Sequence, residues 1–314
     1  MYAYIVRRIL QAVPVMLLVS TGVFLLLHLT PGDPADVILG PDATPERAQE
    51  LRKELGLDRP FHVQWAAWFS HVVRGDLGES IFLRRPVTQA IWERAEPTLM
   101  LTFLALSVAV ILGLSLGVLA AVRQGTWSDL CAMLISLAGI SMPTFWIGLN
   151  LMLIFALILG LLPVAGYEPL QRGAWESLRY MILPAVTLGF HDAALLARMT
   201  RSMMLEVLRE DYVRTARSRG VIEWRVVLDH ALRNALIPLL TVMGLILASL
   251  IGGAIVTETV FNIPGVGRLL IQAVLRRDYP LVQGIVLVIA ATYVLINLCV
   301  DILYGVLDPR VRRA

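Results

Sequence analysis

Residues 98–122 read TLMLTFLALSVAVILGLSLGVLAAV, a long apolar run that contains no charged side chain. A helix needs about 20 such residues to cross the ~30 Å hydrocarbon core of a bilayer. The run lacks the period-2 alternation of a membrane-spanning strand, and only helices or closed barrels satisfy their backbone groups in lipid. We therefore predict a membrane-spanning helix here.

The composition extends this conclusion to the whole chain of 314 residues. It is 57% hydrophobic and 16% charged, whereas an ordinary soluble domain is at most about half apolar and about a quarter charged. The mean hydropathy is +0.72. These values exclude a water-soluble enzyme and predict an all-α membrane protein. Cys131 and Cys299 have no CxxC partner and the five histidines are scattered, so we expect neither a disulfide framework nor a metal site.

Six apolar stretches are long enough to be read as spans. They are residues 9–29, 98–122, 130–162, 181–197, 236–257 and 281–304. The first follows Arg7 and Arg8, but it is too long for a signal peptide and ends without a small-residue cleavage site, so we expect it to be retained.

The third stretch requires a decision between one span and two. Its 33 residues would form a helix of roughly 50 Å, too long for one upright span and too short for two spans with a turn. Gly139, Pro143 and Gly148 fall inside it, and proline removes a backbone bond and lets a helix bend. We predict one tilted, kinked helix.

The spans divide the chain into three parts. An N-terminal segment with the first span covers residues 1–29, and a polar loop covers 30–97, with a short helix expected at 45–55 after Thr44. A core with five spans covers 98–314 and contains the arginine-rich polar stretch 198–235.

Charge then orients the spans. With six spans, both termini and the stretch 198–235 lie on one side with 14 arginines, against 13 basic residues opposite. Long loops are translocated regardless of charge, and leaving out loop 30–97 reduces the opposite count to 5. We therefore predict that the termini and the arginine-rich stretch are cytoplasmic.

The stretch 198–235 contains a helical pattern. Leu208, Tyr212, Ala216 and Gly220 recur at i, i+4 spacing, which predicts one stripe of a short helix that narrows to small residues. Residues 225–235 continue as a second amphipathic piece. Periodicity alone leaves two interpretations open: a solvated loop that is positive for topological reasons, or a docking helix for a soluble partner.

Longer strings from the same region carry a resemblance. Residues 211–220 read DYVRTARSRG and residues 230–238 read HALRNALIP. They resemble the coupling loop of ABC importer permeases, and in particular the first permease of dipeptide, oligopeptide and nickel importers. Thr215 and Arg217 depart from the general Glu-Ala-Ala pattern, and Arg233 stands where a proline is usual. Further strings resemble the same family, in order: 7–8 (RR), 31–34 (PGDP), 75–80 (GDLGES), 141–146 (SMPTFW), 258–268 (ETVFNIPGVGR), 276–280 (RRDYP) and 301–310 (DILYGVLDPR).

The resemblance implies a type I ABC importer permease with six spans in a bacterial cytoplasmic membrane. It implies a second homologous permease, two cytoplasmic ATPase subunits that hold ATP and magnesium, an extracytoplasmic solute-binding protein, and no nucleic acid. The chain's one lysine, Lys53, is not in a phosphate-binding loop, so we expect no cofactor and no catalysis in this chain. The residues implied for ATPase coupling are Leu208, Asp211, Tyr212, Thr215, Ala216, Arg217 and Gly220.

Polar residues inside spans are costly and are functional candidates by default. Asn150, His191 and Asp192 are candidates for lining the pathway, although His191 and Asp192 could instead satisfy each other or nearby backbone. Asp301 is expected to pair with an arginine. Glu258 and Arg268, around the loop 262–267, either contact the binding protein or shape that loop.

Three other classes of function were weighed. A proton-coupled secondary transporter would use His191, Asp192 and Asp301 as a relay, but it should show two repeat halves, and none is found. An intramembrane enzyme would need a nucleophile and a base within reach; Ser141 and His191 are present, but neither belongs to a GxSxG or HExxH motif. A channel would need a filter string, and the sequence shows none. Within the family the substrate stays open among dipeptides, longer peptides, glutathione-type peptides and nickel complexes. Loop 163–180 offers no cluster of metal ligands, which slightly favours peptides.

Overall fold

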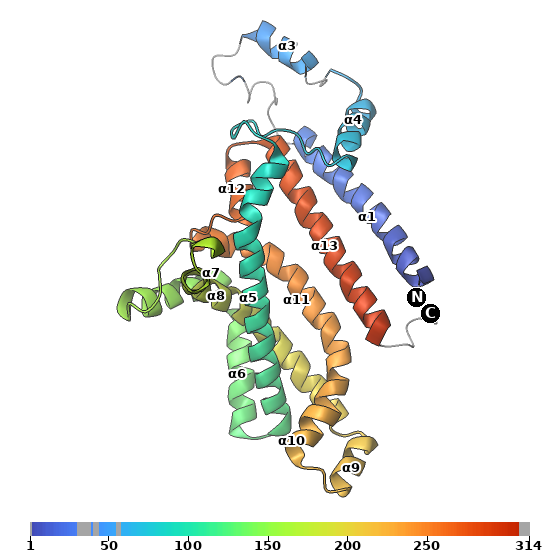
Figure 1. Cartoon of the computed structure of the whole chain (residues 1–314), viewed down its shortest axis with the longest axis vertical. Helices are drawn as coiled ribbons and strands as arrows, with labels where there is room; N and C mark the ends of the chain where they lie inside the picture. The colour runs from blue at the N-terminus through green and yellow to red at the C-terminus, as the bar shows by residue number, and fades with distance from the viewer. Residues whose placement is uncertain (1, 30–38, 40–43, 55–57, 308–314) are drawn as a thin grey trace.

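The computed structural model describes residues 2–29, 39, 44–54 and 58–307. Within them the chain forms helices joined by turns, and no β-strand (Figure 1). The α-helices are α1 (Tyr2–Leu29), α3 (Pro45–Glu54), α4 (Phe61–Val73), α5 (Val87–Val122), α6 (Trp127–Ser141), α7 (Thr144–Leu151), α8 (Ala174–Val207), α9 (Asp211–Ser218), α10 (Glu223–Arg225), α11 (Arg233–Val260), α12 (Val266–Leu275) and α13 (Tyr279–Leu307). Two π-helical segments, η1 (Met152–Ile158) and η3 (Val226–Leu232), and one 3₁₀ turn, η2 (Leu170–Arg172), complete the list. The predicted motifs at 31–34 and 308–310, and the arginines of the tail, lie outside the described residues.

The all-α membrane prediction is confirmed. Among the described residues, five helices are long and apolar enough to cross a membrane, and a bent pair makes a sixth crossing if it is counted as one span. The spans are longer than predicted: α5, for example, begins at Val87 rather than Thr98. Charged residues such as Glu93 and Arg94 end the apolar run but not the helix, because charged side chains form good helices in water. The expected helix at 45–55 is α3, and the backbone N–H of Arg47 donates to the Thr44 hydroxyl at its start.

The prediction of one kinked helix at 130–162 is wrong in its geometry. The segment is two helices, α6 and the α7–η1 pair, which meet at an angle of 107°. Met142 has an extended backbone with ψ 134°, because the ring of Pro143 disfavours the helical conformation in the residue before it. The proline therefore ends α6 instead of bending it.

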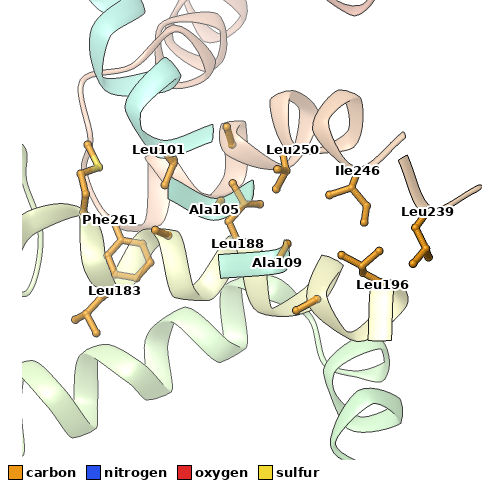
Figure 2. Packing of buried hydrophobic residues seen from close by; sticks show 14 of the residues in the cluster. Leu101, Ala105, Ala109, Leu183, Leu188, Leu196, Leu239, Ile246, Leu250 and Phe261 are labelled. Carbon is orange, nitrogen blue, oxygen red and sulfur yellow. The ribbon is translucent and has the colours of Figure 1, made fainter. Parts of the chain in front are cut away.

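The core is the interface between α5, α8 and α11. Figure 2 shows Leu101, Ala105 and Ala109 of α5 beside Leu188 and Leu196 of α8, with buried residues of α11 on the other side. The backbones approach closely where glycines remove side chains. A Cβ on Gly117 of α5 would lie 2.5 Å from the Cβ of Thr200. Small residues at the contact are the usual way for helices to pack inside a membrane.

Helix α1 lies at the edge of the bundle, where it packs on α13 (Figure 1). A salt bridge of 2.9 Å joins Arg8 to Asp301 at one end of the pair. At the other end the Gln283 amide donates to the carbonyl of Val23 at 3.3 Å. The prediction that Asp301 pairs with an arginine is confirmed, and the partner is Arg8, one of the two arginines of the first segment.

Two strings that looked separate in the sequence meet in space. The Ser80 hydroxyl donates to Asp278 at 2.5 Å, and the backbone N–H groups of Ile81 and Phe82 donate to the same carboxylate at 3.3 Å. Asp278 also accepts from the N–H of Leu281 in the first turn of α13. This buried aspartate ties the loop before α5 to the start of α13 and so fixes the end of the bundle opposite α9 (Figure 1).

Candidate functional site

The helix α9 is the centre of the candidate site. It stands at one end of the molecule with α10, while α3 and α4 stand at the opposite end (Figure 1). It starts at Asp211 and ends at Ser218, and Gly220 beyond it has a left-handed φ of +78°. The sequence stripe is therefore corrected at both ends. Leu208 directly follows the end of α8 and Gly220 makes the turn after α9, so a strict i, i+4 repeat did not mark a continuous helix.

The buried face of α9 packs on its own chain. Val213 and Ala216 are buried against Val226 at the start of η3, with Leu208 packed at the margin of the same cluster. Ala216 and Leu208 thus hold α9 in place, and in this chain they are not part of its open surface. The small Ala216 allows α9 to lie close to η3.

The open face of α9 is polar and mainly basic. Its exposed side chains are those of Asp211, Arg214, Thr215, Arg217 and Ser218, with Arg219 directly after the helix, and Tyr212 is also 41% exposed. Two ion pairs arrange these charges: Arg214 lies 3.5 Å from Asp211, and Arg217 lies 2.7 Å from Glu223 in α10. The hydrogen bond to Glu223 raises the pKa of Arg217 above its usual value, so its guanidinium stays charged and braced against α10. The face thus offers two short hydroxyl side chains between fixed charges.

Tyr212 differs from its neighbours, since its hydroxyl turns toward α11. The Asn234 amide donates to that hydroxyl at 2.8 Å and to the His230 carbonyl at 2.9 Å. The Tyr212 hydroxyl itself lies 3.4 Å from the same carbonyl. Asn234 was not among the sequence candidates, because nothing in the linear pattern pairs it with a tyrosine 22 residues away.

Comparison with known proteins identifies the family of this chain. Residues 113–313 match the model of the binding-protein-dependent transport system inner membrane component, and residues 1–102 match the N-terminal model of such membrane components. The chain belongs to this permease family. A Brucella abortus (strain 2308) protein named as a peptide transport system permease is 48% identical over 312 residues, which is 99% of each chain. The glutathione transport system permease GsiC of Salmonella paratyphi A is 46% identical over 99% of each chain.

Solved structures agree on the fold. An inward-facing form of the MetNI methionine ABC transporter superposes with a TM-score of 0.58 at 19% identity, over 70% of this chain and 97% of that one. The permease is thus a multi-pass inner-membrane subunit of the ABC transporter class, and members of the family work with ATPase and binding-protein partners. The family assignment decides against the proton-coupled secondary transporter.

Among the pathway candidates of the permease, Asn150 lies apart from His191 and Asp192. The Asn150 amide donates to the Trp146 carbonyl at 2.8 Å, within its own helix α7. The His191 ring lies 3.2 Å from the Gly139 carbonyl of α6. Asp192, which is buried, accepts a 3.4 Å bond from Ser249 of α11. His191 and Asp192 therefore link α8 to its two neighbours at mid-span, and Asn150 does not join them.

Glu258 shapes the turn before α12. Its carboxylate is fully buried and accepts from the Thr98 hydroxyl at 2.6 Å and from the Arg268 N–H at 2.9 Å. A Cβ on Gly265 would lie 2.2 Å from this carboxyl group, so the glycine makes room for it. A carboxylate at the first turn of a helix also complements the helix dipole. The expectation that Glu258 contacts a binding protein is therefore corrected, while partly exposed Arg268 stays a candidate.

A further ion pair, between α8 and α6, was not predicted from the sequence. Arg201 of α8 makes a bidentate contact with Asp129 of α6, with N–O distances of 2.7 and 2.8 Å. Asp129 also accepts from the N–H of Gly125 in the turn after α5. The pair fastens three helices together beside the candidate site. An aspartate at the edge of an apolar block was the available signal, but the sequence could not name its partner.

The interpretation of the stretch 198–235 as a loop is also corrected, because most of it is helical. Its first ten residues complete α8, its last three begin α11, and most of the residues between them are helical. Arginines interrupt an apolar pattern without ending the helix that carries them. The polar residues of this stretch were therefore wrongly interpreted as a loop. In the described part of the permease, no group of three or more His, Cys, Asp or Glu side chains could hold a metal ion.

Proposed function

We propose that this permease is one of a pair of homologous subunits that form the pathway of an ATP-driven importer of di- and oligopeptides. A binding protein delivers the peptide at the end that carries α3 and α4, and two ATPase subunits bind at the end that carries α9. The observation that carries the proposal is the open face of α9, a short helix packed on its own chain along one side and exposed with basic residues along the other.

Energy has to come from the partners. The chain has no Gly-Lys-Ser or Gly-Lys-Thr string for binding ATP phosphates, and its one lysine, Lys53, belongs to α3. The chain itself performs no covalent chemistry in this proposal and binds no cofactor, because ATP and magnesium sit on the ATPases. Their closure on ATP displaces α9, and α10, η3 and α11 move with it. The pathway then switches between two states that nucleotide biases.

The proposal includes an orientation. The end with α9 carries the arginines of the stretch 198–235, and short basic segments stay in the cytoplasm. Helices α3 and α4, at the other end, belong to the long segment 30–97, and the basic residues of so long a segment do not keep it in the cytoplasm. We therefore take α9, the start of α1 and the end of α13 as cytoplasmic.

A matched pair of substitutions tests the ATPase role. Thr215 is exposed on α9, and Thr88 is exposed in the first turn of α5 at the opposite end. We expect Thr215→Trp to abolish co-purification of the ATPase subunits, because an indole cannot fit where a short hydroxyl side chain meets a partner. Thr88→Trp should leave co-purification unchanged. Equal ATPase recovery with both variants would refute the docking role.

Glutathione is the second candidate substrate, and one observation favours it. The permease is 46% identical to a glutathione transport permease across 99% of both chains, nearly the identity that it has to the proteins named as peptide permeases. Titration calorimetry on the cognate binding protein, with dialanine and with glutathione, separates the two. Tight binding of dialanine alone supports the peptide proposal, and tight binding of glutathione alone replaces it.

A further inference from the structure

The helix α9 is fastened to the permease at three places along its length. Arg217, near its end, pairs with Glu223 of α10 at 2.7 Å. Val213 and Ala216 pack on Val226 at the start of η3. Tyr212, near its start, meets Asn234 in the first turn of α11 at 2.8 Å. The residues that α9 contacts lie between 223 and 234, a stretch that is roughly 16 Å long as a helix.

The segment between the second and third places is η3, a π-helix of seven residues. Such helices are rare in long runs, and π-type turns are frequent where a helix bends at a functional site. If α11 were connected to α9 through η3 alone, part of the displacement of α9 would not reach α11. The reason is that η3 can change its winding when α9 is pushed. Apolar packing on Val226 reaches only the near end of η3.

The contact of Tyr212 lies at the far end of this segment. The Asn234 amide bonds both the Tyr212 hydroxyl and the His230 carbonyl, which belongs to the last turns of η3. The Tyr212 hydroxyl lies 3.4 Å from that same carbonyl. One side chain of α9 is thereby joined to the end of η3 and to the beginning of α11. Together with Arg217 at the opposite end of α9, this contact prevents α9 from pivoting on its small apolar patch.

We propose that Tyr212 and Asn234 are positioning residues that transmit the movement of α9 to the span α11 past the π-helical hinge η3, and that Tyr212 does not bind the ATPase. The inference rests on the proposed function, since it takes α9 as the helix that the ATPases move. It assigns the residues of α9 two separate tasks. Thr215, Ser218 and Arg219 face outward for docking, whereas Tyr212, although partly exposed, turns its hydroxyl to its own chain for transmission.

The test measures docking and transmission separately in the assembled complex. Cys131 and Cys299 are exposed and are first replaced by serine. Spin labels are then placed at Phe103→Cys of α5 with Glu210→Cys, the residue that precedes α9, and in a second protein at Phe103→Cys with Leu245→Cys of α11, all exposed positions. Electron–electron distances with and without ATP and vanadate report the movement of α9 and of α11.

In the parent protein both distances should change with nucleotide. In Tyr212→Phe and in Asn234→Ala, the ATPases should co-purify as before and the α9 distance should still change. The population with α11 displaced should fall roughly fivefold relative to the resting one, the factor that one ordinary net hydrogen bond contributes to an equilibrium. The double variant should be no worse than either single variant, since both remove the same link. Tyr293→Phe, at an exposed tyrosine of α13, is the matched control and should change nothing.

Two results would overturn the inference. Loss of ATPase co-purification in Tyr212→Phe would put this residue in the docking surface, and unchanged α11 displacement in both variants would show that the link transmits nothing. A parent protein whose α9 distance ignores nucleotide would instead refute the proposed function itself. Asn234→Ala keeps the test valid should Tyr212→Phe fail to insert in the membrane.

Discussion

The packing of α5 on α8 makes one quantitative prediction, for the substitution Gly117→Ala. A Cβ at this position would lie 2.5 Å from the Cβ of Thr200 and 2.6 Å from the carbonyl oxygen of Ala197, whereas ordinary contacts begin at 3.4 Å. The carbonyl belongs to the helix backbone and cannot rotate away. The two helices must therefore separate by about 0.9 Å along part of the core, and overpacking of this kind costs about 1–3 kcal/mol.

The chain provides a matched control in Gly252 of α11. A Cβ at Gly252 would meet no atom within 4 Å. Both substitutions gain the same helix propensity, about 1 kcal/mol for alanine over glycine. The difference between the two variants therefore isolates the steric term, and we expect Gly117→Ala to be less stable than Gly252→Ala by about 1–3 kcal/mol.

The assay is reversible unfolding of the purified permease in mixed micelles with increasing dodecyl sulfate, followed by tryptophan fluorescence. Use of the single subunit avoids any effect of a partner on Gly252. If the two alanine variants unfold within about 0.5 kcal/mol of each other, the α5–α8 contact is looser than the structure shows and the reasoning fails.

Three further predictions concern polar contacts and the turn after α9. Replacing Asp129 with Asn leaves the largely buried guanidinium of Arg201 without its charge partner, and the same unfolding assay should show a loss of about 2–4 kcal/mol; a loss below 0.5 kcal/mol would contradict the bidentate contact. Arg8→Asp should weaken the attachment of α1 by only about 0.5–1 kcal/mol, because the pair is more than a third exposed, and adding Asp301→Arg should restore it; failure of the double swap to recover protease resistance of α1 would refute the pairing. Gly220→Ala should cost about 1–2 kcal/mol of folding stability, since a left-handed φ of +78° penalises any side chain even in open space, and an unchanged unfolding midpoint would argue against the turn.

The sequence predicted the existence of the long helices much better than their ends. Apolar runs reveal the part of a helix that lies in lipid, so five of the six predicted spans each lie within one helix, and only 130–162 is divided between two. The charged beginning of α5, from Val87, could not be distinguished from a loop by hydropathy. Pro143 was correctly marked as a disturbance, but whether a proline bends a helix or ends it depends on what the next segment packs against.

The short helix at the candidate site was predicted in place but not in detail. The sequence directed attention to residues 208–220, and α9 lies there. Its stripe could not show that Ala216 is buried on the chain's own Val226, because the i, i+4 spacing says which residues share a face and not what covers that face. The links from Tyr212 to Asn234 and from Asp129 to Arg201 join residues far apart in the chain, and a single sequence does not contain that information.

The central claim is that α9 faces the cytoplasm and is bound there by the ATPases. Labelling of a single cysteine tests this claim most directly. In a background without Cys131 and Cys299, Ser218→Cys on the open face of α9 is exposed to a membrane-impermeant maleimide. We predict that sealed inside-out vesicles stripped of ATPase label rapidly, and that adding back the ATPases protects the thiol. Labelling only in right-side-out vesicles, or labelling that the ATPases leave unchanged, would contradict the account.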